Sequence, residues 1–94
     1  MPFKKMRSVN LSYNKQGEIY FILHNYADQP DEVRQKIDSL CGTVGKYNHR
    51  ALFRVLTTDE PINRIAREHY ISARQLYYLK SSFYNAWHTY KTVH

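Results

Sequence analysis

Hydrophobic residues recur at intervals of three and four positions along most of this 94-residue chain, which is the pattern of amphipathic helices. The pattern begins near Gln16 and predicts a first helix. Its buried positions would be Ile19, Ile22, Leu23 and Tyr26. The run from 19 to 23 is rich in β-branched and aromatic residues, so a strand is the alternative structure for this segment. Residues 1–15 have little periodicity and are predicted to form a basic, extended arm.

A second helix is predicted to start at Pro30. Proline fits the first turn of a helix, and the acidic side chains of Asp31 and Glu32 are favoured near its positive end. The predicted buried positions are Val33, Ile37, Leu40 and Cys41. Glycine often follows the last residue of a helix, so Gly42 is predicted to end this one and Gly45 to close a short loop.

A third helix is predicted from about Tyr47 to Leu56. Its hydrophobic positions are Leu52, Val55 and Leu56. Arg50 and Arg54 are four residues apart, so they are predicted to share the solvent-facing side of this helix.

The sequence Asp59-Glu60-Pro61 again combines acids with proline and predicts the start of a fourth helix. Its buried positions would be Ile62, Ile65, Ala66 and His69. The pattern ends this helix before Ile71.

The start of the fifth helix carries the clearest local signature in the chain. Ser72 is followed three residues later by Gln75, which is a capping box, and Ile71 is placed to pack on Leu76 as a hydrophobic staple. The buried side of this helix would run to about Lys91 through Leu76, Leu79, Phe83, Trp87 and Tyr90. Five helices with short connections predict an all-α fold. We expect one domain over residues 1–94, with a helical support over 16–58 and a helix-turn-helix with a long last helix over 59–92.

Composition excludes several other classes of protein. Hydrophobic residues make up 43% of the chain and aromatic residues 15%, which is too many for a disordered tail. No apolar run approaches the ~18 residues of a membrane span, and no secretory leader is recognisable. The single cysteine, Cys41, has no partner for an internal disulfide, so a cytoplasmic location without membrane association is expected.

The net charge of +6 is unevenly distributed. Residues 1–15 contribute +4, residues 16–60 contribute −2, and residues 61–94 contribute +4. Two basic segments around a mildly acidic middle indicate a polyanionic partner. The alternative is the ordinary surface charge of a soluble domain.

Residues 61–81 fit a helix-turn-helix, in which two helices are joined by a turn of three or four residues. The small residue Ala66 falls where the helices would cross, and His69 to Ser72 would form the turn. The glycine common in this turn is absent, and Tyr70 takes its place.

The segment Ile62–Leu79 resembles a known group of proteins. It contains the run I-A-x-x-x-x-I-S-x-x-x-x-x-x-L between Ile65 and Leu79, which is similar to the sigma-region-4-like helix-turn-helix of small phage and mobile-element regulators of the ArpU and RinA kind. The resemblance implies double-stranded DNA binding and regulation of transcription. It is at the level of a motif and covers roughly residues 50–90.

Helical geometry assigns different contacts to different side chains of this motif. Residues at the outward-facing start of the second helix would reach base edges in the major groove, where arginine pairs with guanine and glutamine with adenine. These candidate base contacts are Arg74, Gln75 and Tyr78. The candidate contacts to the DNA backbone are Arg64, Arg67, Tyr77, Lys80 and Ser81.

The chain also has candidate residues for contact with a second copy of itself. Tyr84 and Trp87 on the distal part of the last helix are candidates for a homodimer contact. The alternative functions are a helical protein-interaction module, such as an adaptor or inhibitor, and a component of DNA packaging or replication. Because Cys41 lies on an apolar stripe, and no metal-spaced histidine pair or phosphate-binding glycine loop is present, we expect no enzyme activity, no cofactor and no metal.

Overall fold

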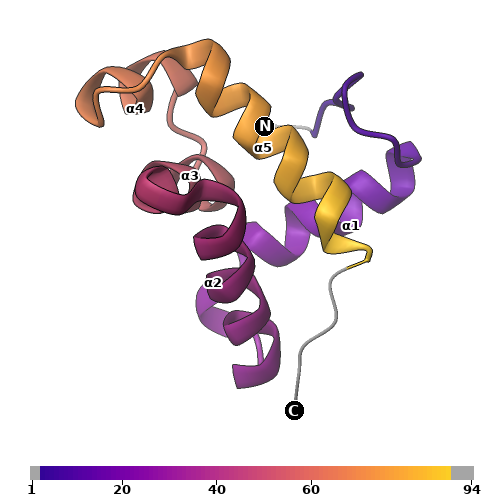
Figure 1. Cartoon of the computed structure of the whole chain (residues 1–94). Helices are drawn as coiled ribbons and strands as arrows, with labels where there is room; N and C mark the ends of the chain where they lie inside the picture. The colour runs from indigo at the N-terminus through magenta and orange to yellow at the C-terminus, as the bar shows by residue number, and fades with distance from the viewer. Residues whose placement is uncertain (1–2, 90–94) are drawn as a thin grey trace.

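The structure is a computed structural model that describes residues 3–89. Within that range the chain forms five α-helices and two short 3-10 turns, with no β-strand (Figure 1). The elements are α1 (Tyr13–His24), η1 (Tyr26–Asp28), α2 (Asp31–Gly45), η2 (Lys46–Asn48), α3 (His49–Thr57), α4 (Ile62–Glu68) and α5 (Ala73–Trp87). The predicted all-α fold of about five helices is confirmed.

Helix α5 is the central element, because it packs against each of the other four helices. Its buried residues include Leu76, Phe83 and Tyr84, each at most 1% exposed. One apolar cluster joins them to the inward positions of the other helices: Ile19, Leu23, Ile37, Leu40, Cys41, Ala51, Leu52, Val55, Leu56, Ile65 and Ala66. Most of these positions follow directly from the hydrophobic periodicity of the sequence.

The N-terminal region differs from the predicted extended arm. Helix α1 begins at Tyr13, three residues before the predicted start, because the Ser12 side chain accepts a hydrogen bond from the backbone N–H of Lys15. Met6 and Val9, which precede it, are buried at 7% and 3% exposure. The segment is therefore a packed part of the fold from Met6 onwards. The alternative of a strand over residues 19–23 is wrong, since they lie in α1.

Helix α2 does not end at Gly42 as predicted. It continues through Gly42, whose Cα faces open space, and ends after Gly45. The residue at which it stops is Lys46, whose backbone leaves the helical conformation with a positive φ of 51°. A Cβ on Gly45 would lie 3.2 Å from Leu52 Cδ2, so a larger residue there would require the Leu52 side chain to shift by a few tenths of an ångström.

Helix α5 ends at Trp87 rather than near Lys91. The last predicted inward residue, Tyr90, and Lys91 lie outside the described residues.

Candidate nucleic-acid interface

The connection between α4 and α5 is a tight turn of four residues, His69 to Ser72. The backbone N–H of Ile71 donates to the carbonyl of Ala66 at 3.0 Å, and that of Tyr70 donates to Arg67 at 3.3 Å. These two bonds form a Schellman motif, in which one residue adopts the left-handed conformation. Tyr70 is that residue, with φ of 56°, at the position predicted from the missing turn glycine.

The start of α5 is fixed by the predicted cap. The Ser72 hydroxyl accepts a hydrogen bond from the backbone N–H of Gln75 at 3.0 Å. Ile71 packs against the same apolar cluster that contains Leu76, consistent with the predicted staple. The first two turns of α5 therefore have a defined direction relative to α4.

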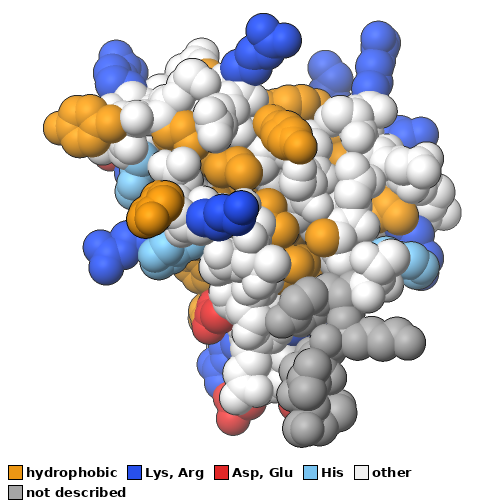
Figure 2. Space-filling view, in the orientation of Figure 1, with side chains coloured by type: hydrophobic (Ala, Val, Ile, Leu, Met, Phe, Trp, Pro, Cys, Tyr) orange, Lys and Arg blue, Asp and Glu red, His pale blue; other side chains and the backbone are white. Residues whose placement is uncertain are grey.

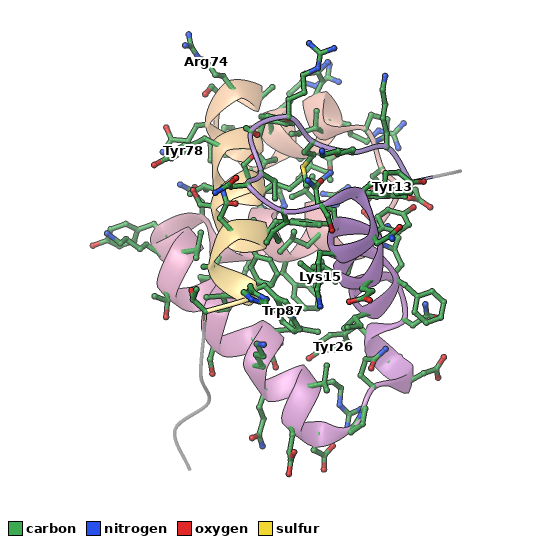
Figure 3. The ribbon with its side chains drawn as sticks, turned by 90° about the vertical axis from the view of Figure 1, so that its right-hand side faces the viewer. Tyr13, Lys15, Tyr26, Arg74, Tyr78 and Trp87 are labelled. Atoms are coloured by element: carbon green, nitrogen blue, oxygen red, sulfur yellow. The ribbon has the colours of Figure 1, made fainter. Side chains whose placement is uncertain are left out.

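The three candidate base-contacting side chains are all exposed. Arg74 and Gln75 lie in the first turn of α5, and Tyr78 is 62% exposed one turn later. Arg74 and Tyr78 extend away from the body of the molecule on the same side of α5 (Figure 3). Helix α4 packs on α5, whose first turns bury Leu76 and leave Arg74, Gln75 and Tyr78 exposed to solvent.

Two of the candidate backbone contacts, Arg64 and Arg67, are exposed on α4. Among residues 3–89, no acidic side chain lies within ion-pair distance of Arg64, Arg67 or Arg74. Their charges are thus available to an anionic ligand.

The acids nearest to α4 are neutralised by Arg54, a residue predicted to be solvent-facing. Arg54 is half-buried, and its guanidinium donates to Glu60 at 2.7 Å and to Glu68 at 2.9 Å. The same guanidinium holds the pKa of Glu60 below its usual value. The prediction of an exposed Arg50–Arg54 pair is wrong for Arg54, because the periodicity of one helix does not indicate that Glu60 from the next connection and Glu68 from α4 will pair with it.

In Figure 2, several blue Lys and Arg side chains project from the upper edge, over α4, the start of α5 and the N-terminal segment, and others lie elsewhere on the same face. Red Asp and Glu side chains lie along the lower edge, over α2. The basic edge therefore includes the outward face of α4 and α5.

Three other candidate DNA contacts are less available than predicted. Ser81 is only 7% exposed, and its Oγ lies 2.6 Å from Ser8 Oγ, so its assignment as a backbone contact is wrong. Lys80 is half-buried, and burial lowers the pKa of its ammonium group. Tyr77 is 42% exposed, with its hydroxyl 3.5 Å from Ser8 Oγ. The N-terminal segment occupies the side of α5 that these residues share.

Lys80 lines a cavity of about 340 Å³ between α1, α5 and the residues before α4. A polar cluster lies in its wall: Asp59 accepts the Tyr20 hydroxyl at 3.0 Å and lies 3.1 Å from His24 Nε2. The hydrogen bond from Tyr20 holds the pKa of Asp59 below its usual value. Asp59 was predicted only to complement the α4 dipole, and no sequence spacing indicates its pairing with α1.

The predicted dimer contact is wrong for Tyr84. This side chain is 1% exposed and belongs to the core. Trp87 is half-buried: it stacks on Phe83 with ring centroids 5.8 Å apart, and the Lys36 ammonium lies 3.9 Å from its ring centroid. The fold of the single chain therefore accounts for most of the surface of both aromatic side chains.

Cys41 is buried in the core, as its place on the apolar stripe predicted. Burial raises the pKa of its thiol to about 12, so the nucleophilic thiolate is scarce at neutral pH. Among the described residues, no three His, Cys, Asp or Glu side chains are arranged to hold a metal ion. No helix between residues 3 and 89 has the length and apolar character to cross a bilayer.

The chain matches no protein-family model, no curated protein and no solved structure.

Proposed function

We propose that this protein binds double-stranded DNA sequence-specifically, with α4 and α5 acting as a helix-turn-helix. Helix α5 is the reading helix, and Arg74, Gln75 and Tyr78 reach base edges in the major groove. Arg64 and Arg67 on α4 contact the phosphates that border that groove. The role we assign is regulation of transcription in a phage or mobile element, as the resemblance of residues 62–79 implies.

One observation carries this proposal: the exposed start of α5 presents Arg74, Gln75 and Tyr78 beside two unpaired arginines on α4. A recognition helix must enter the groove by its N-terminal turns, and here those turns are capped and directed by Ser72. The pairing of Arg54 with Glu60 and Glu68 reduces the negative charge that would oppose DNA at α4.

A protein-interaction module is the second candidate function. The exposed aromatic residues away from the start of α5 favour it: Tyr13, Phe21 and Tyr47 are 54%, 66% and 102% exposed. Aromatic side chains are enriched in protein interfaces. This alternative gives no role to the arginines of α4 and α5, so it ranks second.

The test is a titration of short duplexes by fluorescence anisotropy over a series of salt concentrations. Each phosphate contact contributes ~0.9 to the slope of log K against log salt, so a steep dependence is expected. A preferred site is then selected from a random pool of duplexes. Absence of binding at low salt would overturn the proposal and leave the interaction module as the leading candidate.

A further inference from the structure

The N-terminal segment is held in a fixed shape by one buried side chain. Gln16 is 0% exposed, and its Oε1 accepts the backbone N–H of Met6 at 2.8 Å. Its Nε2 donates to the carbonyls of Met6 and Leu11 at 3.2 and 3.0 Å. These hydrogen bonds close the stretch from Met6 to Leu11. We name this stretch and the residues beside it, 4–12, the N-terminal loop.

The same loop is attached to α5. Asn85 Oδ1 accepts the backbone N–H of Asn10 at 2.7 Å, and Asn85 Nδ2 donates to the Ser8 carbonyl at 3.4 Å. The hydroxyls of Ser8 and Ser81 form a third contact at 2.6 Å. The loop is thus tied to the helix that we propose to read DNA, beyond its exposed first turns.

The N-terminal loop carries three cations on its outer surface. Lys4, Lys5 and Arg7 are exposed, and none has an ion-pair partner in the part of the chain that the structure describes. Together with Asn10 and neighbouring residues of the loop they line a shallow, open depression. The lining of this depression contains three cations and no acid, which suits phosphate groups.

The loop is attached to α5 about two to three turns beyond Arg74. Ser81 and Asn85 follow Arg74 by seven and eleven residues, which is about 10–16 Å along a helix axis. The major groove is ~12 Å wide, so a duplex read at Arg74 brings its flanking backbone close to the loop. In Figure 1 the loop lies beside the middle of α5, at the same upper edge as α4.

We infer that the N-terminal loop is a second phosphate-binding element, which contacts the DNA backbone beside the groove occupied by α5. The inference rests on the proposed function. Lys5 and Arg7 neutralise phosphates, and the bonds from Gln16 and Asn85 fix the backbone beside these two residues before DNA arrives. This preorganisation separates the loop from a flexible basic arm, which would lose conformational freedom on binding.

A pair of matched variants tests the charges. Lys5→Ala/Arg7→Ala removes one lysine and one arginine from the loop, and Lys46→Ala/Arg50→Ala removes the same charges from exposed positions at the junction of α2 and α3. The loop variant should bind duplex DNA more weakly than wild type. Its slope of log K against log salt should be smaller by ~1.8, which corresponds to the loss of about two phosphate contacts. The control variant should retain the wild-type slope. Equal slopes for the two variants, with wild-type protein still binding DNA, would overturn the inference but leave the proposed function in place.

A third variant tests the fixed position of the loop. Asn85→Ala leaves the charge unchanged and removes the acceptor for the Asn10 N–H from an exposed site on α5. We expect its affinity for duplex DNA to lie between the affinities of wild type and of the Lys5→Ala/Arg7→Ala variant. Wild-type affinity in this variant, at unchanged helical content, would show that net charge alone accounts for the effect and would contradict the preorganised loop. A wild-type protein that binds no duplex would instead refute the proposed function.

Discussion

Arg54 on α3 binds Glu60, two residues before α4, through two parallel hydrogen bonds: Nε to Oε2 at 2.7 Å and Nη2 to Oε1 at 2.5 Å. A bidentate pair of this kind restricts orientation as well as distance. The third guanidinium nitrogen reaches Glu68, the last residue of α4. Arg54 therefore fixes both ends of α4 relative to α3.

Replacing Arg54 should reduce stability and DNA binding together. Arg54→Met keeps the aliphatic stem but leaves Glu60 and Glu68 as free negative charges beside the proposed DNA surface. We expect a lower midpoint in urea unfolding and weaker binding to every duplex. The matched control is Arg50→Met, an exposed residue on the same helix without an ion pair in the described chain. Equal midpoints for the two variants would mean that the pairing does not position α4.

The cap of α5 gives a prediction of stability. Ser72→Ala removes the acceptor for the Gln75 N–H and should cost roughly 1 kcal/mol of the free energy of unfolding. Ser39→Ala is the control, because Ser39 is an exposed residue inside α2, where alanine is the better helix former. Urea unfolding of both variants measures the difference. If Ser72→Ala is as stable as wild type, the cap has no net effect.

The start of α5 and most of the core were predictable because they depend on neighbours close in sequence. Ser72 and Gln75 are three residues apart, and the buried positions Ile65, Leu76 and Phe83 follow a helical period. The resulting all-α fold follows from those local patterns.

The contacts that reshaped the candidate site join residues far apart in sequence. Ser8 and Ser81 are separated by 73 positions, and no local pattern indicates that one covers the other. The pairing of Arg54 with Glu60 and Glu68 could not be predicted either, because the periodicity of α3 gives no information about acids elsewhere in the chain. Gly42 is a local signal that gave a wrong helix end. A glycine is compatible with a helix end, but the helix continues unless the next residues leave the helical conformation.

The left-handed conformation of Tyr70 in the α4–α5 turn leads us to expect that glycine at this position stabilises the protein. The left-handed conformation costs an L-residue roughly 1–2 kcal/mol, and glycine escapes that cost but loses about 0.5–1 kcal/mol in backbone entropy. Tyr70 has φ of 56° and is 98% exposed, so Tyr70→Gly forfeits little packing. We expect a gain of roughly 0.5–1 kcal/mol in thermal or urea unfolding. Tyr70→Ala, which keeps the strained conformation, should match wild type; a gain of the same size there would refute the backbone explanation.

Acid should destabilise the protein through the carboxylates before α4. Arg54 holds the pKa of Glu60 below its usual 4.5, and the Tyr20 hydroxyl holds that of Asp59 below its usual 3.8. As the pH falls, these carboxylates are therefore protonated in the unfolded chain before they are protonated in the folded protein. Their contribution to the free energy of unfolding is complete above about pH 4.5 and is lost as the pH falls through their lower pKa values in the folded protein. Glu60→Gln should be less stable than wild type at neutral pH and approach it in acid. A constant difference in urea midpoint across this range would contradict the assignment.

The sharpest test of the DNA proposal compares two arginines with different expected roles. Arg74 extends outward from the first turn of α5, where its guanidinium can pair with a base edge, whereas Arg67 lies at the end of α4, which crosses the DNA backbone in this arrangement. Arg74→Ala should lose ~1–3 kcal/mol of binding at a selected site and discriminate less between that site and random duplex. Arg67→Ala should weaken both duplexes about equally and reduce the salt slope by ~0.9. Both variants remove one exposed positive charge, so each controls for the other, and salt-titrated anisotropy on the two duplexes measures the difference. Equal, nonspecific losses from both would mean that α5 is not the reading helix.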